Sequence, residues 1–207
     1  MELILSAFIL EIRNDISSYR PHRVQGVDHE RWHAASDRLL GQGVARQKAF
    51  IAGLGDVLGA PVKLEDVQPG QYDVLFIVGG HGPMQDLAVH PTIGNLLAAN
   101  LADPRKIVGG VCHGPAGFLS AHRADGSWLF KGRRLTAFTN EEETGATFAG
   151  NAPWLLEDRL RLAGAQFEGA PAWSVHVVAD GNLVTGQQNN SSGAAATKIL
   201  EQLKASA

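Results

Sequence analysis

The sequence lacks the features that mark several classes of protein. It holds one cysteine among 207 residues, which excludes an internal disulfide and a zinc site built from four cysteines. Its 18 basic and 21 acidic side chains nearly balance, giving a formal net charge of -3 at pH 7. We therefore do not expect nucleic acid or an anionic membrane surface to be the main partner, because both select basic proteins.

Long apolar segments are also absent. The apolar run over residues 1–12 is shorter than the ~20 residues that span a bilayer, and Glu2, Ser6 and Glu11 interrupt it. Its acidic start, with no small-residue cleavage pattern after it, does not fit a secretory signal. We predict a soluble, cytoplasmic protein with no membrane partner.

The chain has enough apolar side chain for a single domain over residues 1–207, because 44% of its residues are hydrophobic. Its 24 glycines indicate tight turns between strands and helices. Residues 60–207 carry regular patterns. Residues 1–59 are less regular, because glycines repeatedly interrupt a loose helical spacing over 28–40 and 44–58.

The order of elements after residue 60 predicts an α/β fold. Continuous apolar runs at 74–78 and 106–111 are typical of strands buried on both faces of a parallel sheet. Helices are expected at 91–101 and 116–122. The other expected elements are a short strand at 134–138, a helix at 154–162 ended by Gly164, strands at 175–179 and 182–185 joined at Asp180-Gly181, and a helix at 192–203. This alternation predicts a mostly parallel central sheet with helices packed on it.

Cys112 directly follows the second buried strand, where the chain turns toward a helix. Such an elbow exposes the sulfur near a helix N-terminus, whose dipole favours the nucleophilic thiolate and lowers the thiol pKa. His113 comes next and is the candidate base. The alternative is a buried structural cysteine, since unpaired cysteine is among the most buried residue types.

Gly79, Gly80 and His81 end the neighbouring strand. Glycine amides at the carboxyl ends of the strands, together with the amide of His113, are suited to hold an oxyanion or substrate. The alternative is a plain tight turn. We expect His81 to form a pocket wall and not to carry protons, and Gly114 to leave room for reactants.

Three segments carry a family resemblance. Residues 79–84 (GGHGPM), 111–116 (VCHGPA) and 138–143 (FTNEEE) together resemble the DJ-1/PfpI superfamily, in particular its Hsp31-like, class I glutamine amidotransferase-like proteins. Residues 184–187 resemble the family's last strand. The resemblance covers residues 60–207, with residues 1–59 divergent. It implies a flavodoxin-like three-layer sandwich and a Cys–His–acid site.

The same resemblance implies a function. Related proteins convert methylglyoxal to lactate without glutathione (glyoxalase III activity) or remove early glycation adducts. The resemblance therefore implies a small aldehyde or glycated groups as substrate and no cofactor or metal. It also implies a homodimer, which is common in the family. Carried over by position, Cys112 is the nucleophile, His113 the base and Glu143 the third member. The residues alone also allow Asn140 and Glu143 to form a capping box, so both interpretations of Glu143 stay open.

The N-terminal segment departs from the family. Relatives have a Thr-Gly-x-x-x-x-Glu segment whose acid forms a hydrogen bond with the cysteine sulfur. The most similar segment of this sequence, residues 6–12, places Ile12 at the acid position. Glu11 is the candidate supporting acid; the alternative is a charge that ends an apolar element. The divergent or shortened segment keeps two other functions open, a cysteine amidase or peptidase and a catalytically impaired holdase-type chaperone.

A zinc-protease pattern also occurs at residues 29–33 (HERWH), with two histidines one helical turn apart. The longer form of the motif needs glycine and histidine further on, where Ser36 and Leu39 stand. We therefore interpret His29 and His33 as part of a surface helix and expect no metal site.

Overall fold

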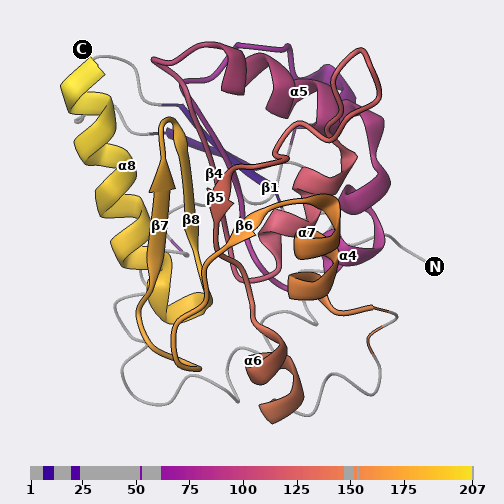
Figure 1. Cartoon of the computed structure of the whole chain (residues 1–207). Coiled ribbons are helices and arrows are strands. Elements are labelled where there is room, and N and C mark those ends of the chain that lie inside the picture. The colour runs from indigo at the N-terminus through magenta and orange to yellow at the C-terminus, as the bar shows by residue number, and fades with distance from the viewer. Residues whose placement is uncertain are drawn as a thin grey trace.

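The protein is described as a computed structural model over residues 7–11, 20–23, 52, 62–146, 152 and 154–206. A central sheet lies between two layers of helices (Figure 1). Its strand order is β2-β1-β3-β4-β8-β7. The strands are β1 (Ala7–Glu11), β2 (Arg20–Arg23), β3 (Val74–Ile77), β4 (Ile107–Val111), β7 (Val177–Asp180) and β8 (Leu183–Gly186).

The sheet is mixed, with a parallel centre. β3, β4 and β8 pair in parallel, whereas β1 is antiparallel to both β2 and β3, and β7 is antiparallel to β8. Among the described strands, β2, β3, β4 and β8 therefore run in one direction, and β1 and β7 in the other. The mostly parallel α/β sandwich predicted from the sequence is confirmed.

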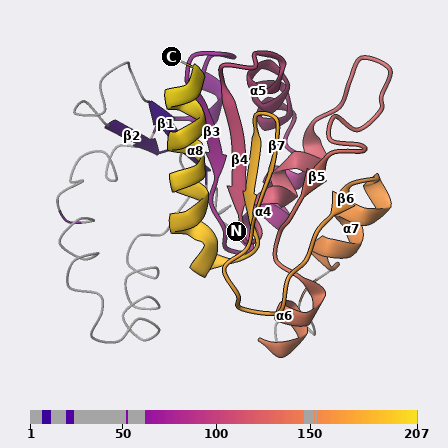
Figure 2. The ribbon, with the colours of Figure 1, turned by 60° about the vertical axis from the view of Figure 1, so that its left-hand side comes forward.

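The two faces of the sheet are covered by different helices (Figure 2). One face packs against α8 (Ser192–Ser206), and Val74, Ile107 and Val184 meet Ile199 there. The other face packs against α5 (Pro91–Ala102) and α7 (Leu156–Ala163) in a larger core that includes Leu75. Successive residues of a strand point to opposite faces, so uninterrupted apolar runs are what a sheet covered on both sides requires.

The remaining described elements are short. They are η3 (Leu64–Asp66), α4 (Gly82–Gln85), η4 (Leu87–Val89), η5 (Gly114–Ser120), β5 (Arg134–Leu135), α6 (Asn140–Gly145), β6 (Gln166–Phe167) and η6 (Asn189–Ser191). None of the described helices is both long and apolar enough to cross a membrane.

Several predicted elements match the structure. The two buried strands and the helix at 91–101 are confirmed as β3, β4 and α5, and the last helix as α8. Gly164 caps α7 in the left-handed region, with φ 102°, as expected. The hairpin is confirmed, but Asp180 pairs with Leu183, so the two turn residues are 181 and 182 and the predicted turn was one residue early.

Two other predictions need correction. The segment at 116–122 is not an α-helix; the chain forms the 3-10 helix η5 there, and η5 packs closely on the core. A Cβ at Gly117 would lie 2.7 Å from the Ile77 side chain. The strand predicted at 134–138 is only β5, and it pairs with β6 in a separate two-stranded sheet. The predicted helical segments at 28–40 and 44–58, apart from residue 52, lie outside the described residues, as do His29 and His33.

Candidate active site

Cys112 lies at the carboxyl end of β4, immediately before η5. Its backbone has φ 61°, in the left-handed region that side chains rarely adopt. Gly79 lies beside this elbow, and a Cβ there would be 2.6 Å from the Cβ of Cys112. The strained turn therefore presents the sulfur at the carboxyl edge of the sheet and requires glycine at position 79.

The Cys112 side chain is partly buried, and its sulfur lies among hydrogen-bond partners. The Nδ1 of His113 is 3.3 Å from the Cys112 sulfur, and the backbone N–H groups of Gly80 and His113 also bond it. Burial nevertheless raises the pKa of Cys112 to about 11. The N–H groups of Gly80 and His113 oppose this rise, and the negative charges of Glu142 and Glu143 add a smaller contribution to it. The expected lowering of the thiol pKa is therefore wrong, because burial, with a smaller contribution from the two carboxylates, outweighs the local donors.

His113 is fixed between the sulfur and a carboxylate. Its ring is 2% exposed, packs 4.4 Å from the Phe138 ring and places Nε2 2.5 Å from Glu143 Oε2. Burial lowers the His113 pKa more than the carboxylates raise it, so the ring is neutral near pH 7. With Nε2–H donating to Glu143, the lone pair is on Nδ1, which faces the sulfur. This is the tautomer that a general base needs.

The position of Glu143 follows from the capping of α6. Thr139, not Asn140, is the N-cap, and it forms a reciprocal capping box with Glu142. The predicted cap was therefore displaced by one residue, and the capping role falls on Glu142. Because Glu142 satisfies the helix start, the neighbouring Glu143 turns toward the histidines.

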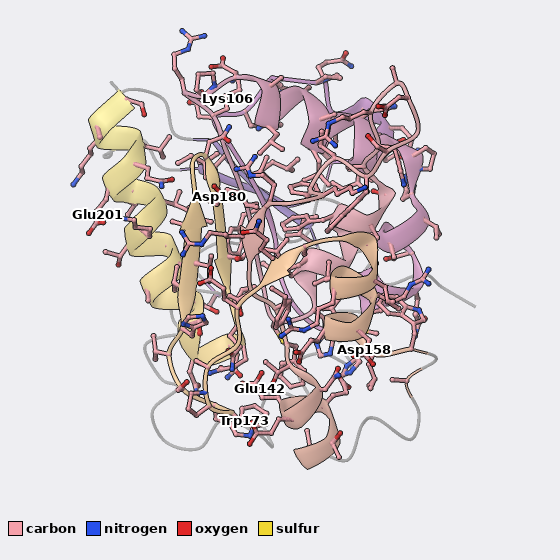
Figure 3. All side chains as sticks on the ribbon, viewed as in Figure 1. Lys106, Glu142, Asp158, Trp173, Asp180 and Glu201 are labelled. Carbon is pink, nitrogen blue, oxygen red and sulfur yellow. The ribbon has the colours of Figure 1, made fainter. Side chains whose placement is uncertain are left out.

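Glu142 is a second buried carboxylate with a different set of partners. It accepts hydrogen bonds from the backbone N–H of Trp173 (2.8 Å) and from Gln187 Nε2 (3.0 Å). Glu142 and Trp173 lie close together at the end of the molecule where α6 begins (Figure 3). Glu142 thus ties α6 to the end of β8 and to the loop before β7. Sequence reasoning did not identify this role, although residues 184–187 had been noted as a family segment.

His81 completes the site from the turn after β3. Its Nε2 is 2.8 Å from Glu143 Oε1, and its ring centroid is 4.0 Å from that of His113. Burial raises the Glu143 pKa, but the hydrogen bonds from His81 and His113 outweigh it and lower that pKa below its usual value. Glu143 is therefore a carboxylate between two imidazole rings, a contact that sequence reasoning missed by treating His81 as a pocket wall.

The glycines serve different purposes. Gly80 has φ 94°, which favours glycine, and directs its N–H to the Cys112 sulfur. Gly114 is buried, and a Cβ there would lie 2.1 Å from the carbonyl oxygen of Ile77. Close packing against the end of β3 therefore explains glycine at position 114, in place of the predicted room for reactants.

Glu11 does not lie with these residues. In the antiparallel register of β1 on β3, Ala7 pairs with Ile77 and Leu10 with Val74. Glu11 is therefore beyond the amino end of β3, whereas Cys112 is at the carboxyl end of β4. The register corrects the interpretation of Glu11 as an acid supporting the cysteine and matches the alternative, a charge that ends an apolar strand.

Three described side chains are close enough to consider a metal ion. The nearest ligand atoms of His81, His113 and Glu143 all lie within 4.8 Å of one another. Two ligands of one tetrahedral ion, each at ~2.0–2.1 Å, would be about 3.3 Å apart. The N···O separations of 2.5 and 2.8 Å are instead those of direct hydrogen bonds, so we interpret the group as a hydrogen-bonded chain of proton-carrying residues.

Comparison with known proteins identifies the family of the chain. The sequence model described as the DJ-1/PfpI family matches residues 44–202. The chain belongs to the DJ-1/PfpI family. Within the family, it is 32% identical over 141 residues to the glutamine amidotransferase-like class 1 domain-containing protein 1 of Bos taurus, covering 68% of this chain and 64% of the bovine protein.

Two further DJ-1/PfpI relatives have names that state an activity. The glutathione-independent glyoxalase HSP31 of Saccharomyces cerevisiae is 30% identical over 179 residues, covering 82% of this chain and 74% of that protein. The crystal structure of glyoxalase III from Candida albicans superposes with a TM-score of 0.63 at 27% identity, covering 72% of this chain and 64% of that one.

Proposed function

We propose that the protein is a cofactor-independent cysteine enzyme that converts methylglyoxal, or a similar small reactive carbonyl, to a hydroxy acid without glutathione. The observation that carries this proposal is the chain of contacts from Cys112 through neutral His113 to Glu143 at the carboxyl edge of the sheet. The names of the yeast relatives support the reaction class. Deglycation of early glycation adducts would use the same thiol.

In the proposed reaction, His113 Nδ1 takes the Cys112 proton as the sulfur bonds to the aldehyde carbon. Because the pKa of Cys112 is raised to about 11, proton removal accompanies attack instead of preceding it. Glu143 stabilises the imidazolium that forms, and this imidazolium returns the proton to the aldehyde oxygen. The hemithioacetal then isomerises to a thioester of lactate. Water releases lactate and restores the thiol.

Amide or peptide hydrolysis at Cys112 is the second candidate. The same three residues could form and hydrolyse an acyl-enzyme, and the bovine relative is named for its likeness to glutamine amidotransferases. The holdase, the homodimer and the cytoplasmic location stay predictions. Fold and triad geometry alone do not choose a substrate, so the assay must compare substrate classes.

A substrate panel tests the proposal. Purified protein is given methylglyoxal without glutathione, glutamine, and a set of peptide amides, and lactate, ammonia and free amines are measured. Lactate formation above the protein-free rate, with no amide cleavage, is the expected result. Amide cleavage without lactate would favour the hydrolase, and no turnover with suppressed aggregation of a client protein would favour the holdase.

A further inference from the structure

Among the described residues, two that are not glycine have their backbone in the left-handed region. They are Cys112, with φ 61°, and Trp173, with φ 65°. Such a conformation costs free energy and persists only where the surrounding structure imposes it, often at a functional site. The elbow that presents the sulfur accounts for the strain at Cys112. The strain at Trp173, in the loop before β7, needs a separate explanation.

Core packing does not account for the conformation of Trp173. The residue is 46% exposed, so its large ring gains only part of the stabilisation that full burial would give. Its backbone is nevertheless held on both sides. The N–H donates to Glu142 over 2.8 Å, and the carbonyl oxygen accepts from Asn190 Nδ2 over 3.1 Å. These two hydrogen bonds fix the left-handed turn and, with it, the place of the indole ring.

The indole ring packs on Phe138. The two rings meet edge to face, with centroids 5.7 Å apart and planes at 77°, which is a favourable arrangement of aromatic rings. Trp173 lies at the end of the molecule where α6 begins (Figure 3), and Phe138 directly precedes Thr139, the N-cap of that helix. Phe138 is only 4% exposed, so the half-exposed indole ring supports it from the side of the solvent.

Phe138 contacts both members of the Cys112–His113 pair. Its backbone N–H donates to the Cys112 carbonyl oxygen over 2.9 Å, and its ring centroid is 4.4 Å from that of His113. The sulfur and Glu143 hold the two nitrogens of the imidazole ring. Those two contacts alone leave the ring free to tilt about the line that joins its nitrogens, and the Phe138 ring limits that tilt.

We propose that Trp173 is a positioning residue that acts through Phe138 to hold the His113 ring between the Cys112 sulfur and Glu143. The inference rests on the role of His113 as the base in the function proposed above. A base is effective only within hydrogen-bond reach of the proton that it takes, and a misplacement of about 1 Å can cost ~10²-fold in rate. The strained backbone at Trp173 then serves the same reaction as the strained backbone at Cys112.

The variant Trp173→Gly tests the role of the ring. Glycine adopts the left-handed region readily, so the turn and its N–H bond to Glu142 can persist without the indole ring. Because the base is displaced and not removed, we expect kcat for lactate formation to fall ~10–10²-fold, with little change in KM.

The titration of His113 provides a second measurement, which does not need turnover. Water that reaches a loosened imidazole ring should raise its lowered pKa toward the ordinary value of 6.5. The charged and titratable groups that act on this ring, Glu142, Glu143 and His81, are unchanged in the variant. NMR of protein carrying isotope-labelled histidine follows the titration, and His113→Gln identifies the signal of His113 by its loss.

Two further variants are the controls. Trp173→Phe keeps an aromatic ring for Phe138 to pack on, so it should recover most of the wild-type kcat and the wild-type titration of His113. Val175 belongs to the same loop and is 62% exposed, but it has no ring to support Phe138. Val175→Ala should therefore match the wild type in both measurements.

An unchanged kcat and an unchanged His113 titration in Trp173→Gly would overturn the inference. A raised KM with an unchanged kcat would also overturn it, because Trp173 would then contact the substrate and not position the base. If the wild type forms no lactate, the proposed function fails. The shift of the His113 titration in Trp173→Gly, and its reversal in Trp173→Phe, would still decide whether Trp173 positions His113.

Discussion

Cys112 and His113 form a pair in which both members are uncharged at rest. Burial raises the pKa of the thiol to about 11, and burial lowers the pKa of the imidazole below 6.5. A thiolate–imidazolium pair would need the opposite shifts. The proposed reaction therefore depends on a well-placed base at the moment of attack and not on a pre-formed thiolate.

Alkylation of Cys112 by iodoacetamide should show these shifts. Because the thiol pKa is raised, the rate should keep rising with pH through 9 without a plateau. Because the His113 pKa is lowered, the ring is still mostly neutral at pH 6.5 and becomes protonated only at lower pH, so the acid limb of kcat/KM should lie below 6.5. A plateau of alkylation near neutral pH would mean that the sulfur is already ionised and that this description of the pair is wrong.

Glu143→Gln should reduce turnover far more than it reduces stability. An amide cannot accept an N–H from both histidines and stabilise a protonated His113, so kcat should fall ~10²–10⁴-fold. The measurement is lactate formation together with the thermal unfolding midpoint.

The neighbouring Glu142→Gln is the matched control for that experiment. Glu142 accepts hydrogen bonds from Thr139, Trp173 and Gln187 and touches neither histidine ring in the described contacts. We expect it to lose ~1–3 kcal/mol of unfolding free energy, because buried donors lose their acceptor, with a smaller effect on kcat. Equal losses of kcat in both variants would contradict separate roles for the two carboxylates.

At the residue scale, the sequence predicted which residues gather but not every contact between them. Cys112 and His113 could be identified because they follow a buried strand directly. Glu143 was ambiguous, since the cap at Thr139 could not be distinguished from one at Asn140 by spacing alone. The His81–Glu143 contact joins residues 62 positions apart and depends on how two distant segments pack. A local sequence pattern therefore cannot predict it.

At the scale of elements, close packing of η5 on β3 sets the position of the elbow. The Gly114 position allows no Cβ, because the Ile77 carbonyl oxygen would lie 2.1 Å away. Gly114→Ala should therefore lower the unfolding free energy by ~1–3 kcal/mol and also reduce alkylation of Cys112 by displacing the elbow. Chemical denaturation and alkylation rates measure the two effects.

Gly193→Ala provides the control for the glycine test. Gly193 is in α8, and no atom of the described residues lies within 4 Å of a Cβ placed there. Alanine is favoured over glycine in helices by up to ~1 kcal/mol, so this variant should be neutral or slightly more stable. A Gly114→Ala variant as stable as Gly193→Ala would show that η5 can move away from β3.

Elements with a strong local signal were predictable. β3 and β4 read as continuous apolar runs because both faces of the sheet are covered. η5 and β5 were not, because tertiary packing decides whether a short segment becomes a 3-10 helix or joins a separate sheet. The hairpin was located to within one residue, since Gly181, with φ 53°, fits either turn placement.

At the scale of the whole molecule, the α/β order after residue 60 was enough to predict the fold. The N-terminal strand was not predictable in detail, because the register of β1 on β3 decides where Glu11 lies. That register separates Glu11 from the cysteine. The supporting groups around Cys112 in the described residues therefore come from the turns after β3 and β4 and from α6.

The molecule should work without a metal ion. The short N···O contacts around Glu143 are hydrogen bonds, and in the proposed attack on the aldehyde His113 moves the proton. Dialysis against a strong chelator, with metal content checked by elemental analysis, should leave lactate formation unchanged. Loss of activity on chelation and its recovery with zinc would overturn the cysteine mechanism in favour of a metal-dependent one.

The most direct test of the central claim is kcat/KM for lactate formation from methylglyoxal, without glutathione, in the wild type and in Cys112→Ala. The account predicts turnover by the wild type. It predicts no turnover above the protein-free rate in the variant, which should keep its fold because the side chain loses only the sulfur. Equal lactate formation by the two proteins would contradict Cys112 as the nucleophile and, with it, the proposed function of this site.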